Sequence, residues 1–375
     1  MDRERMAEPL RNSFGAAIPK RIGAMLQAVD AAFDADAFVA DALRGYEPLN
    51  LMQRGRHIAH ALRRHLPDDY DAAIALLLAS VDHAPARDGA PMGAFLFLPY
   101  TEFVSLHGLD HFATSMRALH ALTQRFTGEF SVRPFIERFP ELALAQLRAW
   151  ASDPNEHVRR LVSEGTRPRL PWAARLRAFQ RDPAPTLALL ELLRDDPSLY
   201  VRRSVANHLN DIGKDHPEVL TAVARRWMVD AGEERQWIVR HALRSAVKRA
   251  EAGALEVLGF AHEARVAVEA VRIAPKRVAI GESVDIGFTL RNTGAAAQRV
   301  LVDYVVFYVK ANGEARAKVF KLRTLDLAAG EAVRIAKRLS LEQRTTRTHY
   351  AGRHRVELLV NGRPMPLGEF VLVGS

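Results

Sequence analysis

One stretch of the chain combines a high density of arginine with two side chains of another kind. Residues 155–181 hold seven arginines against two acids, Glu156 and Glu164. Arginine suits bidentate contact with phosphate. The segment from Glu164 to Trp172 contains one glycine and two prolines, a composition that predicts an ordered loop between helices. An acid and a tryptophan in a cationic loop indicate a site. The alternative is a solvated basic loop in which Trp172 covers the core.

A second candidate carboxylate is Asp211. It follows Arg203 by eight residues, a little over two helical turns, and is therefore predicted near the end of a helix. A carboxylate there opposes the helix dipole, because anions are favoured at the N-terminus. Such an unfavourable placement can mark function, although Lys214 nearby offers an ordinary ion pair as the alternative.

Two copies of one motif, 43 residues apart, belong to the elements that must position these side chains. Residues 153–160 and 196–203 both read Asp-Pro-x-x-x-Val-Arg-Arg, and Val239 starts a shorter third copy, Val-Arg-His, 38 residues later. This spacing is near the period of HEAT and armadillo units, whose helices stack to bury their apolar faces. Each Asp-Pro predicts an N-cap followed by proline at the first helical position, with the valine in the core.

Stacked copies would align their arginines along one surface, which suits a phosphate backbone. The predicted DNA contacts of the helical region are Arg159, Arg160, Arg202, Arg203 and Arg240. For any single arginine, pairing with an acid such as Glu156 or Asp196 is a reasonable alternative. Pairing explains all three sets less well.

The pattern of apolar and polar residues changes near residue 263. Before it, apolar residues recur at intervals of three and four, and prolines ahead of Glu141, Thr186 and Glu218 predict helix starts. After it, Val, Ile, Phe and Tyr alternate with polar residues between Gly and Asn turns. The predicted strands are 266–273, 284–291, 299–310, 316–323, 331–339, 353–360 and 369–373. The predicted fold is mainly α: a HEAT-like helical-repeat solenoid (1–262) followed by an immunoglobulin-like β-sandwich (263–375).

The predicted β domain carries a second basic cluster around an Asn-Gly hairpin. Its members are Lys310, Arg316, Lys318, Lys321 and Arg323, with Glu314 the one acid among them. We expect Lys310, Arg316 and Lys318 to contact DNA. The alternative is that exposed positive charge on a hairpin prevents edge-to-edge aggregation.

Composition excludes several classes of chemistry. The 375 residues contain no cysteine, which excludes disulfides, thiolate zinc sites, iron–sulfur clusters and cysteine nucleophiles. His107 and His111 are four apart, but a third ligand in a recognisable arrangement is missing, so we predict no metal site. The net charge of +9 is a moderate pointer to nucleic acid. No apolar run approaches the length of a membrane span, and the N-terminus lacks a leader pattern, so we expect a cytoplasmic protein.

Three segments carry a family resemblance. They are Phe126–Phe130 (FTGEF), Val158–Trp172 (VRRLVSEGTRPRLPW) and Val201–Ile212 (VRRSVANHLNDI). The chain resembles bacterial alkylpurine DNA glycosylases of the AlkC type, in the HEAT-like AlkC/AlkD group of DNA alkylation repair proteins. The resemblance spans nearly the whole chain, and the C-terminal β domain favours the AlkC branch. The middle segment is the specific one.

The resemblance implies hydrolysis of the N-glycosidic bond of cationic alkylated bases in double-stranded DNA. It implies 3-methyladenine above all, 3-methylcytosine as a second lesion, and exposure of the lesion by DNA bending without full base flipping. By motif position, the active-site residues fall on Glu129, Glu164, Trp172 and Asp211. The resemblance further implies a monomer that needs no cofactor and acts at the nucleoid.

We hypothesise that Glu164 and Asp211 flank the lesion nucleotide, one orienting water and the other stabilising the sugar cation. Trp172 would pack against the nucleotide, and Glu129 would complete the anionic pocket. The rival hypothesis is a non-catalytic HEAT scaffold or lesion sensor that binds DNA or an acidic protein. Carboxylates among cations favour the enzyme, because a scaffold has no reason to place anions where phosphates bind.

Overall fold

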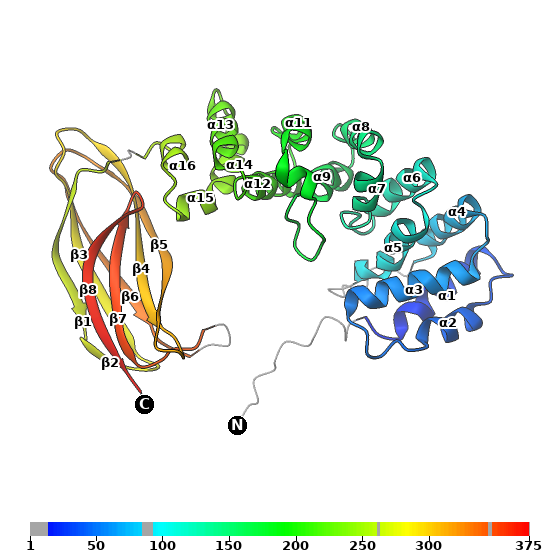
Figure 1. Cartoon of the computed structure of the whole chain (residues 1–375), viewed down its shortest axis with the longest axis horizontal. Coiled ribbons are helices and arrows are strands. Elements are labelled where there is room, and N and C mark those ends of the chain that lie inside the picture. The colour runs from blue at the N-terminus through cyan, green and yellow to red at the C-terminus, as the bar shows by residue number, and fades with distance from the viewer. Residues whose placement is uncertain (1–13, 85–92, 261–262, 344–346, 375) are drawn as a thin grey trace. The chain divides into compact units, whose positions relative to one another are not determined.

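The computed structural model describes residues 14–84, 93–260, 263–343 and 347–374. The chain divides into two compact units, Met1–Asp215 and His216–Ser375. The helices come first, and the strands follow (Figure 1). The change from helix to strand falls where the sequence pattern predicts it, between residues 257 and 266. The predicted domain boundary at 262/263 stays a prediction, because the second unit joins helices and strands.

The first unit is built of short helices that pack on their neighbours along the chain, coloured blue to green in Figure 1. They are α1 (Ala17–Val29), α2 (Ala35–Leu43), α3 (Leu51–His65), α4 (Tyr70–Ser80), α5 (Leu98–His107), α6 (Phe112–Thr123), α7 (Arg133–Arg138), α8 (Pro140–Trp150), α9 (Glu156–Gly165), α10 (Arg177–Arg181), α11 (Ala184–Leu193) and α12 (Leu199–Ile212), with 3₁₀ turns at Val81–His83 and Gly93–Phe97. Helices α8 and α11 begin with a proline in their first turn, as predicted. Within the described ranges, no helix has the length and apolar content needed to cross a bilayer.

The repeated motif forms the starts of α9 and α12, but the predicted caps are wrong. Each helix begins two residues after the proline, with Asn155 or Ser198 as the N-cap. The carboxylates of Asp153 and Asp196 instead accept the backbone N–H of these caps, at 2.8 Å in both copies. An aspartate whose side chain bonds the backbone two residues on forms a turn, so the Asp-Pro pair closes the loop before the helix. The valine of each copy is fully buried, as predicted.

The second unit contains four helices and eight strands within its described residues. The helices are α13 (Pro217–Met228), α14 (Glu233–Ala242), α15 (Arg244–Lys248) and α16 (Ala252–Val257). The strands are β1 (Val266–Ala274), β2 (Arg277–Ala279), β3 (Ser283–Asn292), β4 (Gln298–Val309), β5 (Ala315–Leu327), β6 (Ala332–Ser340), β7 (Gly352–Val360) and β8 (Arg363–Val373).

The strands form a two-sheet sandwich. One sheet has the order β1-β3-β6, and the other has the order β2-β8-β7-β4-β5. Inward-facing side chains of both sheets make one apolar core, which includes Phe288, Val306, Leu358 and Phe370. All seven predicted strands are present. Strand β2 was not predicted, because three residues that pair parallel with β8 are too few to show an alternating pattern.

Candidate active site

Helices α9 and α12 pack against each other, and each helix has a polar face at this contact. On α9 this face carries His157, Arg160 and Glu164, at helical spacings of three and four. On α12 it carries Tyr200, Ser204, His208 and Asp211. The rings of His157 and Tyr200 meet edge to face at 5.4 Å, and the Ser204 hydroxyl donates to Glu164 Oε2 at 2.6 Å.

Three of the predicted acids are joined by two arginines into one chain of alternating charge. Arg160 donates to Glu129 Oε2 at 3.0 Å and lies 3.5 Å from Glu164 Oε1. Arg167 donates to Glu164 Oε1 at 2.7 Å and to Asp211 Oδ2 at 2.9 Å. The three carboxylate residues are 6%, 7% and 1% exposed in chain order. A buried carboxylate is tolerated only when paired, so the arginines make this acid cluster possible.

Lys214 ends the charge chain at Asp211. Its ammonium donates to Asp211 Oδ1 at 2.8 Å, so the ordinary ion pair expected as the alternative exists. Asp211 therefore has both this pair and the contact with Arg167, and it lies in the last turn of α12 as predicted. Two cations beside this carboxylate offset its unfavourable position at the negative end of the helix dipole.

Glu129 comes from the loop between α6 and α7 rather than from either helix. Burial raises the pKa of its carboxyl and Glu164 adds to this, while the Arg160 charge opposes it. The loop approaches α9 closely at Gly165, where a Cβ atom would lie 2.6 Å from Val132. Glycine at this position therefore lets the loop bring Glu129 to Arg160.

Glu164 lies in the last turn of α9, so its predicted place in the loop is wrong by two residues. The helix continues through Gly165 because the Thr166 hydroxyl bonds the carbonyls of Val162 and Ser163, at 2.7 and 3.2 Å, and closes its last turn. The following loop carries Arg167 and is held by Arg133 of α7, which donates to the carbonyls of Gly165 and Arg167 at 3.0 and 2.9 Å.

A second layer of hydrogen bonds holds Glu164 from behind. Ser204 also bonds the Ser163 hydroxyl, at 2.9 Å. The Nδ1–H of His208 donates to the Ser163 carbonyl at 3.0 Å. Burial lowers the pKa of His208 to about 3, so its ring is neutral at physiological pH. The carboxylate thus has a fixed orientation, which is what a reacting group requires.

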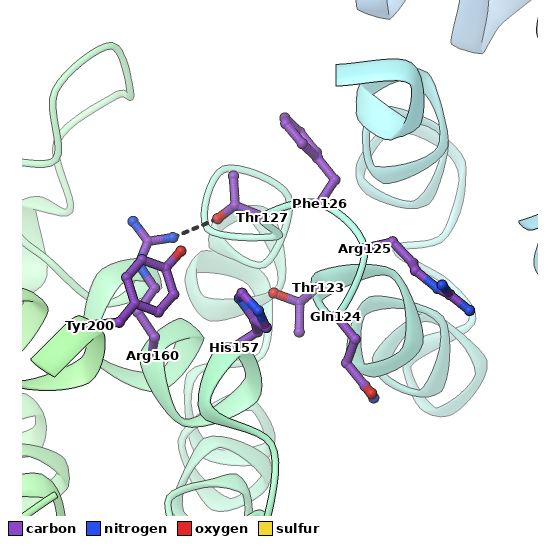
Figure 2. Close-up of a pocket in the computed structure, with 8 residues that line it drawn as sticks. All are labelled: Thr123, Gln124, Arg125, Phe126, Thr127, His157, Arg160 and Tyr200. Carbon is purple, nitrogen blue, oxygen red and sulfur yellow. Dashed lines mark hydrogen bonds between the residues drawn. The ribbon is translucent and has the colours of Figure 1, made fainter. Parts of the chain in front are cut away.

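A pocket of about 240 Å³ opens beside Arg160. Figure 2 shows Tyr200 and His157 on one side of it and the loop residues Phe126 and Thr127 on the other. The Arg160 guanidinium lies 5.0 Å from the centre of the Tyr200 ring and donates to the Thr127 hydroxyl at 2.7 Å. Arg160 therefore joins this pocket to the buried carboxylates.

Trp172 lies in the loop that follows α9. Its side chain is 74% exposed, so the alternative in which it covers the core does not hold. Its φ of 67° places it in the left-handed region, which is unusual for a bulky residue. A large exposed aromatic held in such a backbone suits contact with a ligand.

The first arginine of each motif copy has an intramolecular role. Arg159 bonds the carbonyls of Asp153 and Pro154 at 2.8 and 2.9 Å, and it forms a two-pronged ion pair with Asp196. In the second copy Arg202 bonds the two equivalent carbonyls at 3.0 and 2.8 Å. The pairing alternative thus holds for Arg159, and DNA contact by either arginine stays a prediction.

Arg160, also a predicted DNA contact, is mostly buried beside Glu129 and Glu164, whereas the remaining predicted contacts are exposed. Arg203 is exposed on α12, and among the described residues it has no ion-pair or hydrogen-bond partner. Arg240 is exposed on α14 and bonds Gln236. The β4–β5 hairpin carries three exposed cations, Lys310, Arg316 and Lys318. Together with Arg347 they line one pocket. Slight desolvation and the charges of Arg347 and Lys310 lower the pKa of Lys318.

The partners that organise the acids were not predicted. Arg167 follows Glu164 by three residues, close enough along the chain for their side chains to meet, but the sequence analysis predicts no contact between them. Tyr200 and Ser204 precede Asp211 at helical spacing and were not considered. Nothing local in the sequence indicates that Arg167 reaches Asp211, 44 residues away. Across the described ranges, no group of three or more His, Asp or Glu side chains could hold a metal ion.

Comparison with known proteins finds two matching family models and a relative of similar length. A family model described as "DNA alkylation repair enzyme" matches residues 113–249, which include α9 and α12. A second model, "Uncharacterised protein YhaZ, C-terminal Ig-like domain", matches residues 267–374. The chain is 37% identical to the uncharacterized protein YhaZ of Bacillus subtilis (strain 168), over 85% of this chain and 87% of that protein.

A solved structure is similar over almost the full length. It is the Pseudomonas fluorescens alkylpurine DNA glycosylase AlkC, bound to DNA containing an abasic site analog. The identity is 39%, the TM-score is 0.88, and the match covers 97% of this chain and 99% of that one. The fold, the two matched models and this similarity agree. The chain belongs to the DNA alkylation repair enzyme family, and within that family it is of the AlkC type.

Proposed function

We propose that this enzyme is a DNA glycosylase that hydrolyses the N-glycosidic bond of cationic alkylated bases in duplex DNA. The observation that carries the proposal is the chain of ion pairs that gathers Glu129, Glu164 and Asp211 from three separate segments. Membership of the family and similarity to a glycosylase bound to DNA with an abasic site analog support it. The proposed substrates are 3-methyladenine and 3-methylcytosine.

The chemistry suits a site built from paired carboxylates. An N3-alkylated base carries a positive charge, so its bond to C1′ is weakened. As this bond breaks, its electron pair goes to the base nitrogen and neutralises the base, while positive charge develops on the deoxyribose. Carboxylates near the sugar stabilise that charge. The oxygen of a water then bonds C1′, and a carboxylate takes up the proton released, leaving an abasic site.

The proposed roles follow the environment of each acid. Glu164, fixed by Ser204 and Arg167, and Asp211, fixed by Arg167, would flank the sugar. Glu129 has a raised pKa, which suits it to receive a proton. Trp172 would pack on the exposed nucleotide, where an aromatic face contributes about 0.5–2 kcal/mol of cation–π attraction.

We propose that the enzyme holds DNA through exposed cations rather than through the paired ones. On the helices these are Arg203 and Arg240, and on the hairpin they are Lys310, Arg316 and Lys318. Arg160 is better suited to hold the acids, because both of its terminal nitrogens face carboxylates. The proposed form is a monomer acting on the bacterial chromosome in the cytoplasm.

The test is release of 3-methyladenine from methylated duplex DNA under single-turnover conditions. We expect wild-type protein to release the base and Glu164→Gln and Asp211→Asn to be slower by about 10²-fold or more. Glu141→Gln is the matched control, because Glu141 is an exposed acid in the first turn of α8. Its rate should equal that of wild type.

Two results would count against the proposal. Wild-type protein that folds and binds DNA but releases no base would favour the scaffold or sensor hypothesis. Full activity in Glu164→Gln or Asp211→Asn would remove that residue from the scheme. DNA-binding titrations of both variants, compared with those of the control, separate a lost reaction from lost binding.

We further propose that the lesion is exposed by bending of the duplex, without rotation of the base into an enclosing pocket. An enzyme that encloses the base should discriminate against larger alkyl groups, because a snug pocket cannot admit them. The proposal predicts similar rates for N3-methyl and bulkier N3-alkyl adenine. A rate that falls steeply with the size of the alkyl group would contradict it.

A further inference from the structure

Another concave site lies within the second unit. It is a pocket of about 340 Å³ lined by helices α13, α14 and α15, the segment after α16, and strands β4 and β5. Four of its lining residues are cations from four different elements: Arg240 of α14, Arg244 of α15, Arg299 of β4 and Lys321 of β5. None of the described residues that line it is an acid.

The floor of this basic pocket is apolar. Val247, Leu258, Phe260 and Leu301 line it between the cations. The Arg299 guanidinium lies 5.6 Å from the centre of the Phe260 ring, and Phe260 itself is buried. A guanidinium over an aromatic face is attracted to the ring, which restricts the positions that it can take.

Two of these cations keep most of their positive charge uncompensated. Arg240 bonds the uncharged amide of Gln236. Arg299 is 3.7 Å from Asp326, and both of these side chains are mostly exposed, so the pair contributes little. Arg244 donates to the carbonyl of His241 at 2.6 Å, which positions its guanidinium at the pocket.

Lys321 lies near the buried Asp303 of β4. Burial raises the pKa of Asp303, and the charges of Lys321 and Lys248 oppose that rise. Cations gathered in one pocket repel one another, and an anion that enters would relieve this repulsion.

We propose that this basic pocket binds a backbone phosphate of DNA, with the apolar floor against the adjoining deoxyribose. Planar guanidinium groups donate two parallel hydrogen bonds to phosphate oxygens. The apolar lining favours a DNA phosphate over an acidic peptide, because a deoxyribose adjoins each phosphate of the backbone. The inference rests on the proposed function, since it takes DNA as the ligand. It adds that helices and sandwich strands hold one phosphate together.

The experiment compares two double variants of the full chain. Arg240→Ala/Lys321→Ala removes two cations of the pocket. Arg334→Ala/Lys337→Ala removes two exposed cations of β6, in the other sheet, and serves as the matched control. Affinity for an unmodified duplex is measured by fluorescence anisotropy across a series of salt concentrations. No base excision is needed, so a failure of the glycosylase proposal leaves this test intact.

Removal of one cation that binds phosphate should reduce the slope of log affinity against log salt by about 1. We expect a decrease of about 2 for the pocket variant, one for each cation removed, and no change for the control. An unchanged slope in the pocket variant overturns the proposal. Equal decreases in both variants also overturn it, because they reflect net charge alone.

Two further arms separate the possible ligands. Inorganic phosphate should raise the Tm of wild-type protein and leave the pocket variant unaffected. If phosphate acts in this way while the salt slope for DNA stays unchanged, the pocket holds a free anion and the proposal fails. Poly-glutamate that displaces DNA from wild-type protein at equal charge concentration would point to an acidic protein and would also overturn it. Lys321→Ala alone, at an exposed strand position, repeats the slope test if the double variant does not fold.

Discussion

In the two copies of the Asp-Pro-x-x-x-Val-Arg-Arg motif, the first arginine makes the same contacts, whereas the second arginine has different surroundings. In both copies the first arginine, Arg159 or Arg202, bonds the two carbonyls that precede its helix. The second arginine differs. Arg160 is largely buried between Glu129 and Glu164, whereas Arg203 is exposed.

The difference arises from what lies beside each helix. The loop between α6 and α7 presents Thr127 and Glu129 to Arg160, at 2.7 and 3.0 Å. Among the described residues no acid contacts Arg203. The first arginine of each copy therefore stabilises the loop before its helix. The proposed chemistry depends on the second arginine, whose surroundings differ between the copies. This fits the general rule that function belongs to sites rather than folds.

Removing Arg160 should have the largest effect of any change in the two copies. Arg160→Ala leaves two buried carboxylates without their shared cation. We expect the free energy of unfolding to decrease by about 3–5 kcal/mol and base release to slow by about 10²-fold. Chemical denaturation and single-turnover excision measure the two effects. Arg203→Ala is the matched control, and equal behaviour of the two variants would refute the distinction between the copies.

The pH dependence of the reaction should sharpen the role of Arg160. Its charge opposes the upward shift that burial gives the pKa of Glu129. In Arg160→Gln that pKa should rise further, so the acidic limb of the rate profile should move to higher pH. A raised pKa means that the folded state binds the proton more tightly. Glu129 therefore contributes a loss of stability as pH rises from its unfolded pKa to its folded pKa, and this loss should be greater in the variant.

Excision rates measured across pH, with denaturation at each pH, test both expectations. A profile that coincides with that of wild type would show that Glu129 need not be ionised.

The first arginines should affect stability alone. Arg159→Ala leaves the buried Asp196 carboxylate without its ion pair, and we expect a cost of about 2–3 kcal/mol. Arg202→Ala removes hydrogen bonds to two carbonyls, and we expect the free energy of unfolding to decrease by about 1 kcal/mol. Thermal denaturation measures both, and the salt dependence of DNA binding should stay as in wild type. A reduced salt slope would restore these arginines as DNA contacts.

The smallest expected effect belongs to Arg203→Ala. Because Arg203 is exposed and unpaired within the described chain, stability should change by less than about 0.5 kcal/mol. Removal of its proposed phosphate contact should lower the salt slope of DNA affinity by about 1. Anisotropy titrations across salt concentrations measure it, and an unchanged slope would place the DNA backbone elsewhere.

The sequence alone predicted the elements well and their ends less well. Seven of the eight described strands were predicted, because alternation and Gly or Asn turns are local signals. Strand β2 was missed, and β8 begins at Arg363 rather than at the predicted residue 369. The starts of α9 and α12 were placed too early, because Asp-Pro is compatible with either an N-cap or a turn before it. The side-chain bonds to Asn155 and Ser198 decide between them.

The sequence is sufficient to predict the kind of protein: a helical-repeat region and a β-sandwich, without cysteine chemistry, and with acids among arginines. It does not predict which charged side chains meet, because these pairs form only when the chain folds. Arg160 reaches Glu129 across 31 residues, and Arg167 reaches Asp211 across 44. Periodicity reports only on neighbours within one element, whereas an ion pair between elements depends on how the helices pack. Burial, which makes these pairs strong and raises the pKa of Glu129, likewise exists only in the folded chain.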